Sequence, residues 1–172
     1  DGAHVLKVKA VDRAGNVGTE QSFAAVTIDT ASPPAPAIAA LAAGYNTSPI
    51  AIDWNDVTDG TNTISYVLEY AGNAGFSGAT PAARATSDYS FDAAAAGQGE
   101  YWFRVKTVSR LPGSGGIKES DWSLIASTIY DATGPDAPEL MLLTPNPTNQ
   151  SPQTWSWSAP AGATRYEVQA DN

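Results

Sequence analysis

An internal repeat constrains the possible folds of this chain more than any other feature of its sequence. Asn46, Ser48, Pro49 and Trp54 return as Asn149, Ser151, Pro152 and Trp157, at a fixed spacing of 103 residues. Residues 2–13 (GAHVLKVKAVDR) match residues 99–110 (GEYWFRVKTVSR) in a similar way. Self-similarity of this kind indicates a structural unit that is used repeatedly. We therefore predict the closing strands of one unit in residues 1–30, a complete unit in 31–131 and the opening strands of another in 132–172.

Alternating apolar and polar residues predict that these units are built from β-strands. The apolar members of the alternation fall into four sets: Leu6, Val8 and Ala10; Ile50, Ile52 and Trp54; Tyr66, Leu68 and Tyr70; and Tyr101, Phe103 and Val105. A period of two places each set on one face of a strand. Clusters rich in Gly, Asn and Asp separate the strands, a pattern typical of an antiparallel β-sandwich. Residues 93–96, four alanines, are the only helix-compatible run and are too few to form a stable helix alone.

Two proline-rich segments lie where the repeated units join. Residues 30–36 contain three prolines, and residues 132–138 contain two more. Proline favours extended polyproline geometry, which makes a semi-rigid linker. We predict that both segments are linkers between units.

Composition excludes several classes of function. The formal net charge is −9, which disfavours nucleic acid because phosphate contacts require Lys and Arg. The chain has no cysteine, so it has no disulfide, thiolate nucleophile or Cys-ligated metal. No apolar run reaches the roughly 18 residues that a membrane-spanning helix needs.

The complete unit resembles a fibronectin type III module. The resemblance is carried by Pro36 at its start, Trp54, the segment 66–70 (YVLEY), the segment 101–106 (YWFRVK) and the run 120–123 (SDWS). Residues 1–16 resemble the closing strands of bacterial immunoglobulin-like repeats. The resemblance implies Greek-key β-sandwich modules in tandem, and a hydrogen bond from the Tyr101 hydroxyl near a strand corner. His4 stands at the matching position of residues 1–30 and is expected to be a partly buried strand residue.

The same resemblance implies a structural function and no enzymatic activity. Such repeats form spacers, adhesive regions, stalks or filaments of extracellular or cell-surface bacterial proteins. The implied partners are neighbouring modules, identical subunits, a glycan or a host or cell-surface protein. The alternative is an accessory region of a secreted polysaccharide-degrading enzyme, which contacts carbohydrate.

Asp29, Asp56 and Asp59 are the candidate metal ligands. In a sandwich of this kind they would gather near the first linker, and clustered carboxylates suit calcium. The alternative is a solvated acidic loop. Asp53, Asp56 and Asp59 could also serve as acid and base, but nothing in a polar loop raises a carboxyl pKa to suit that role.

Trp102 is the candidate ligand contact. It points away from Tyr101 and Phe103, so it is expected on the outer face of its strand. An exposed Trp can stack on a sugar ring, whereas packing against Arg104 would be a purely structural role. Trp54, Trp122 and Trp157 are expected to lie in the core or to cover a sheet.

Overall fold

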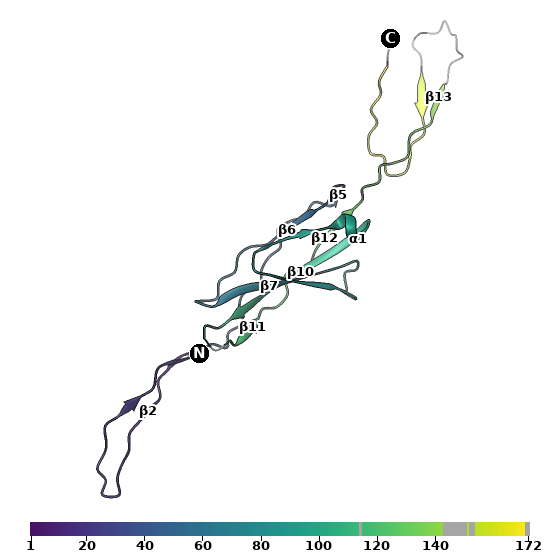
Figure 1. Ribbon diagram of the computed structural model, residues 1–172. Coiled ribbons are helices and arrows are strands. Elements are labelled where there is room, and N and C mark those ends of the chain that lie inside the picture. The colour runs from purple at the N-terminus through teal and green to yellow at the C-terminus, as the bar shows by residue number, and fades with distance from the viewer. Residues whose placement is uncertain (114, 143–150, 152–153, 171–172) are drawn as a thin grey trace. The chain divides into compact units, whose positions relative to one another are not determined.

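The structure is a computed structural model that describes residues 1–113, 115–142, 151 and 154–170 (Figure 1). It is an all-β protein with one turn of helix, as the alternating sequence pattern predicts. Internal contacts divide the chain into two compact units, residues 1–131 and 132–172. Asn149 and Pro152 of the sequence repeat lie outside the described residues.

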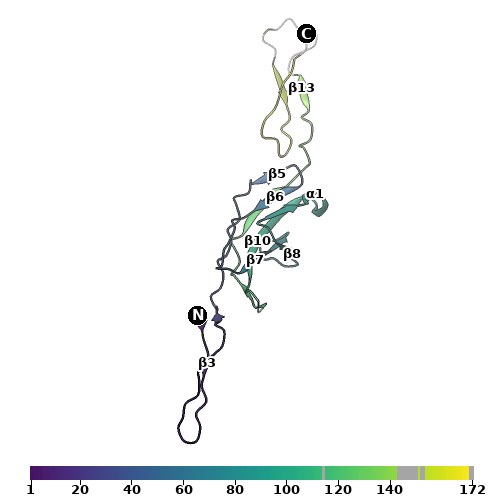
Figure 2. The ribbon, with the colours of Figure 1, turned by 60° about the vertical axis from the view of Figure 1, so that its left-hand side comes forward.

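The first unit contains a six-stranded sheet. Its strands are β5 (Gly44–Tyr45), β12 (Ala126–Tyr130), β10 (Gly99–Arg110), β7 (Thr63–Ala71) and β8 (Thr80–Arg84) in that spatial order, with β11 (Ile117–Glu119) also paired to β10. The central strands β7 and β10 lie side by side (Figure 2). They pair in antiparallel fashion, and their register places Leu68 opposite Val105 and Glu69 opposite Arg104. The short pair β5–β12 is parallel, which differs from the purely antiparallel arrangement predicted from sequence.

A smaller sheet pairs β6 (Ile50–Asp53) with β9 (Asp88–Phe91) in antiparallel register. Helix α1 (Ala93–Ala96) follows β9 directly. The Asp92 side chain caps it by accepting a hydrogen bond from the Ala95 amide, and the Ser48 hydroxyl accepts one from Ala94. These two caps offset the poor intrinsic stability of so short a helix.

One apolar core joins residues of the two sheets. Ile50, Ile52 and Phe91 come from the smaller sheet; Leu68, Phe103 and Val105 come from β7 and β10. Trp54 also lies in this core and meets the Tyr66 ring edge-on, with centroids 5.5 Å apart. The buried faces predicted for the complete unit are therefore confirmed. The Tyr101 hydroxyl donates the expected corner hydrogen bond, to the Gly97 carbonyl at 2.7 Å.

Two serine hydroxyls accept hydrogen bonds from β10 amides in the segment between the end of β11 and the start of β12. The Thr107 amide donates to Ser120 Oγ at 2.9 Å, and the Val105 amide donates to Ser123 Oγ at 3.1 Å. In return the amides of Ser120 and Ser123 donate to the carbonyls of Thr107 and Val105. Both serines are buried, so each hydroxyl satisfies an amide that would otherwise have no partner.

Arg104 organises the outer face of the large sheet. Its guanidinium lies 4.2 Å from the Phe76 ring centroid and 4.3 Å from that of Trp122. Glu69, directly opposite in the register, accepts from its Nε and Nη2 at 2.9 and 2.6 Å. Trp122 thus covers the sheet as predicted, and it takes the place beside Arg104 that the sequence suggested for Trp102.

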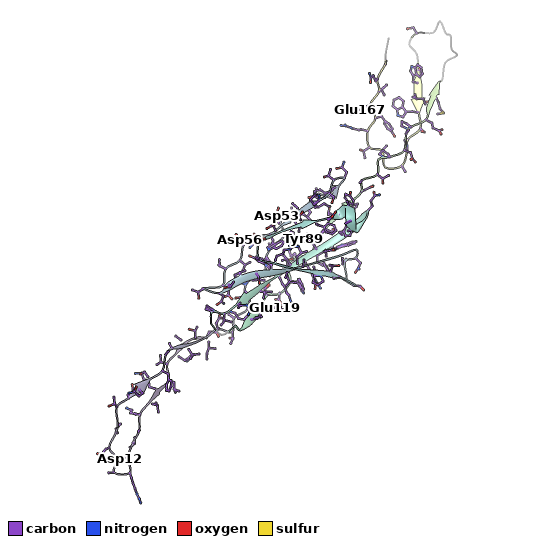
Figure 3. The ribbon with its side chains drawn as sticks, in the orientation of Figure 1. Asp12, Asp53, Asp56, Tyr89, Glu119 and Glu167 are labelled. Atoms are coloured by element: carbon purple, nitrogen blue, oxygen red, sulfur yellow. The ribbon has the colours of Figure 1, made fainter. Side chains whose placement is uncertain are left out.

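Residues 1–30 form an antiparallel hairpin, named here the N-terminal hairpin. Strands β1 (Gly2–His4) and β2 (Lys7–Val8) pair with β4 (Val26–Ile28) and β3 (Gln21–Ser22), respectively. Asp12 lies at the turn of this hairpin (Figure 3), where its carboxylate accepts hydrogen bonds from the backbone amides of Ala14 and Asn16. The apolar side chains Leu6, Val8, Phe23 and Val26 are exposed.

The second unit contains a short hairpin whose large apolar side chains Leu140, Met141 and Trp155 are exposed. Strand β13 (Leu140–Leu142) pairs with β14 (Trp155–Trp157) in antiparallel register. The Trp157 ring contacts that of Tyr166 at 5.7 Å between centroids. Trp157 is half-buried and Trp155 is exposed, so the Trp–Tyr contact of the first unit recurs here.

Candidate functional site

The most concentrated polar cluster of the first unit surrounds the ammonium group of Lys118, on β11. Lys118 Nζ lies 2.6 Å from Asp29 Oδ2 and 3.0 Å from Asp59 Oδ2. It also donates to the Ala31 carbonyl at 2.7 Å. Asp29 follows β4 of the N-terminal hairpin, and Asp59 lies in the loop between β6 and β7. One side chain, itself only 11% exposed, therefore connects three separate segments of the chain.

Asp59 is held by neutral donors as well. The Ser109 hydroxyl donates to Asp59 Oδ2 at 2.6 Å, and Asn62 Nδ2 donates to the same oxygen at 2.9 Å. Asn62 also reaches Asp29 Oδ2, at 3.4 Å. We call Asp29, Asp59, Asn62, Ser109 and Lys118 the joint cluster.

Hydrogen bonding to the charged forms sets the pKa values in the joint cluster. The bond from Lys118 lowers the pKa of Asp29 against the opposing effect of burial, with a further contribution from Asn62. Bonds from Ser109, Asn62 and Lys118 lower the pKa of Asp59. The bonds to Asp29 and Asp59 raise the pKa of Lys118. All three groups are consequently charged at neutral pH.

The first linker is anchored to the folded unit along its length. Pro33 and Pro36 are buried. The Pro34 carbonyl accepts from Thr107 Oγ1 at 2.8 Å, and the Ala37 amide donates to Asn55 Oδ1 at 2.6 Å. The sequence predicted a semi-rigid spacer, but side-chain contacts as well as proline geometry restrain this segment.

The structure brings together two of the three predicted calcium ligands. Asp29 and Asp59 meet at Lys118, whereas Asp56 is exposed and lies on the surface of the first unit (Figure 3). Within the described part of the chain, no group of three or more His, Cys, Asp or Glu side chains gathers as a metal site would require. An ammonium group supplies the positive charge beside Asp29 and Asp59.

Calcium is expected to leave the thermal stability of the wild-type chain unchanged. The Lys118 ammonium already pairs with the carboxylates of both Asp29 and Asp59, and a divalent ion would have to displace it. Calorimetry with millimolar CaCl2 and with EDTA measures this directly. A rise in melting temperature with calcium, absent with magnesium, would instead support the site predicted from Asp29, Asp56 and Asp59.

The joint cluster is expected to weaken in acid. The folded-state pKa values of Asp29 and Asp59 are lowered, so their contribution is fully present above about pH 4, the ordinary Asp pKa. It is lost as pH falls through the lowered values. Lys118 acts in the opposite sense, because its raised pKa keeps its contribution until pH rises above about 10.5.

A carboxyl-carbon NMR titration of wild type and Lys118→Met tests this assignment. Removing the ammonium should raise the midpoint of Asp29 more than that of Asp59, since Ser109 and Asn62 still donate to Asp59. Equal midpoints in the two proteins would show that Lys118 does not set these pKa values.

The remaining candidate residues lie apart from the joint cluster. His4 is exposed on β1 opposite Val26, so the expectation of a partly buried histidine is wrong. Among the residues that the structure describes, no second sheet packs over the hairpin at this position. Trp102 is half-buried on the outer face of β10, and its glycan contact stays a prediction. Asp53 and Asp56 are exposed, and Asp59 has a lowered pKa, the opposite of what a general acid needs.

Lys118 was not singled out by sequence reasoning. It stands in a short strand after a glycine-rich loop, and nothing local distinguishes it from a solvated lysine. The repeat gave a partial indication that the first linker differs from the second. Asp29 has a counterpart in Asp131, but Asp59 has no acidic counterpart in residues 158–164.

Comparison of the chain with models of known protein families and with curated proteins finds no match. Among the described residues, no helix is long and apolar enough to cross a membrane; α1 has only four residues.

Proposed function

We propose that this chain is a spacer region of an extracellular bacterial protein, built from tandem antiparallel Greek-key β-sandwich modules of the fibronectin type III and immunoglobulin-like kind. The joint cluster is the observation that carries the proposal. In it Lys118, a largely buried lysine of one predicted module, binds Asp29, which belongs to the preceding one. A spacer transmits position or force only when its modules do not swivel freely at their linkers.

Three further features support a modular spacer. Core residues of two sheets form one cluster within residues 31–131, as a self-contained module needs. The Trp and Tyr positions of this core return in residues 132–172. The hairpin of residues 1–30 repeats the pairing of β10 with β12, with Gly2 opposite Ile28 where Gly99 lies opposite Tyr130. The extracellular and bacterial parts of the proposal rest on the sequence resemblance alone.

Spin labels across the first linker test whether the joint cluster stiffens it. The chain has no cysteine, so Arg13→Cys and Thr86→Cys can carry labels in the hairpin and in the complete unit. We expect a narrow distribution of label distances in the wild-type background. Lys118→Met should broaden it, because Asp29, Ala31 and Asp59 lose their shared donor.

Lys106→Met is the matched control for the spin-label experiment. Lys106 forms an ion pair with Glu119 on β11, and its ammonium lies 5.1 Å from the Trp122 ring centroid. Its loss should leave the distribution narrow. A broad distribution in the wild-type background would overturn the spacer proposal. Labelling of intact cells by an antibody to residues 31–131 separately tests the extracellular location.

A further inference from the structure

Asp59, an acceptor at the centre of the joint cluster, is followed directly by Gly60 in the sequence. In an Asp–Gly pair the main-chain nitrogen of the glycine can attack the side-chain carbon Cγ of the aspartate, because no Cβ hinders its approach. Gly60 has a φ of 57°, and a hydrogen bond of 3.1 Å from the Asn62 amide to the Asp59 carbonyl closes the turn around it. This turn favours glycine, so the fold places a reactive pair beside Lys118.

Three donors hold the Asp59 carboxylate while the joint cluster is assembled. Ser109 Oγ, Asn62 Nδ2 and Lys118 Nζ lie 2.6, 2.9 and 3.0 Å from Asp59 Oδ2. Attack by the Gly60 nitrogen requires a protonated carboxyl group that has turned toward the main chain, because an ionised carboxylate has no good leaving group. The three bonds favour the charged form and lower the pKa of Asp59. They therefore oppose the attack.

We propose that Asp59 is a modification site, at which isoaspartate forms when Lys118 leaves and which the assembled joint cluster protects. In the reaction the Gly60 nitrogen forms a bond to Asp59 Cγ and loses its proton, and one carboxyl oxygen leaves as water. Water then adds to the resulting cyclic succinimide. Addition at Cγ restores aspartate, whereas addition at the main-chain carbonyl leaves the chain running through Cγ as isoaspartate. One water molecule leaves and one enters, so no other reactant is needed.

Isoaspartate cannot rejoin the joint cluster in the original geometry. Its main chain has one additional carbon atom, and its free carboxylate is attached directly to Cα. The carbonyl that accepts from the Asn62 amide becomes this carboxylate, while the carbon whose oxygen binds Ser109 and Lys118 becomes part of the peptide bond. A joint that stays open is thus marked covalently. The inference requires the contacts of the joint cluster but not the spacer function.

Peptide mapping of the aged full chain measures the modification. Wild type and Lys118→Met are incubated in mildly acidic buffer, digested and fragmented by electron transfer, which distinguishes isoaspartate from aspartate at residue 59. We expect isoaspartate to accumulate about tenfold faster in Lys118→Met, because one hydrogen bond to a charged group is worth about that factor. Ser109→Ala removes the 2.6 Å bond and is the second variant, expected to act in the same direction.

Two control variants separate loss of the joint cluster from loss of overall stability. Lys106→Met removes an ion pair between β10 and β11, with Glu119, and should leave the rate at residue 59 unchanged. Ile52→Val removes a methyl group from the buried core and should act far less than Lys118→Met. In guanidinium hydrochloride, wild type and Lys118→Met should react equally fast, because unfolding removes the joint cluster from both.

Three results would overturn the proposal. The first is an equal rate in folded wild type and folded Lys118→Met. The second is an equal rate in Ile52→Val and Lys118→Met, because protection would then come from overall folding. The third is the absence of isoaspartate at residue 59 even in guanidinium hydrochloride. Each of these leaves the spacer function standing if the spin-label distribution across the first linker is narrow. A broad distribution with slow reaction in wild type would instead overturn the spacer function and support the protection of Asp59.

Discussion

Replacing Phe103 with alanine is expected to lower the free energy of unfolding by about 3–5 kcal/mol. Phe103 is fully buried, and its ring meets that of Phe91 edge-on with centroids 5.2 Å apart. Truncation removes this contact and leaves a cavity between the two sheets, which the paired strands on either side cannot close. Urea unfolding followed by tryptophan fluorescence measures the loss, because Trp54 lies in the same core.

Phe23→Ala is the control for the core variant. Phe23 has the same side chain, but it is 59% exposed on the N-terminal hairpin. Its truncation should change the free energy of unfolding of the complete unit by no more than about 0.5 kcal/mol. A similar loss in both variants would mean that the hairpin is covered in solution, and the core assigned here would then be incomplete.

Removing both hydroxyls, in Ser120→Ala combined with Ser123→Ala, is expected to lower the free energy of unfolding by about 2–6 kcal/mol. Each substitution leaves one buried amide without an acceptor, those of Thr107 and Val105, and each such loss costs about 1–3 kcal/mol. Water cannot replace the hydroxyls easily because both serines are buried.

Hydrogen exchange distinguishes this mechanism from a general loss of stability. The amides of Val105 and Thr107 should exchange faster in the double variant than neighbouring amides of β10. Ser127→Ala, at an exposed position of β12, should leave exchange and stability unchanged. Unchanged exchange at Val105 and Thr107 in the double variant would show that these hydroxyls are not their acceptors.

The serine contacts also bear on the joint cluster. Ser120 holds the chain to β10 directly after β11, the strand that presents Lys118. Ser120→Ala removes the hydroxyl half of this contact and keeps the bond from the residue-120 amide to the Thr107 carbonyl, so this end of β11 is loosened and Lys118 can shift relative to Asp29 and Asp59. We therefore expect the spin-label distribution across the first linker to broaden in the double variant, less than in Lys118→Met.

Much of the core was predictable from local pattern. Ile50, Ile52 and Trp54 alternate with polar residues, and a strand places alternate residues on one face whatever it packs against. Tyr101, Phe103 and Val105 followed the same rule. Leu6, Val8 and Ala10 alternate with polar residues just as regularly, yet the face that they define is exposed. Alternation identifies a face, but burial requires a second layer that this segment does not meet in the described structure.

The sequence by itself determined the all-β class, the buried faces of the complete unit and the repeat that relates its strands to the flanking segments. These properties depend on the order of neighbouring residues along one strand. Only the tertiary structure decided that Lys118 meets Asp29, 89 positions away, and that Trp122 rather than Trp102 stacks on Arg104. Such contacts depend on which strands the fold places side by side, and a local pattern is the same whichever neighbour is present.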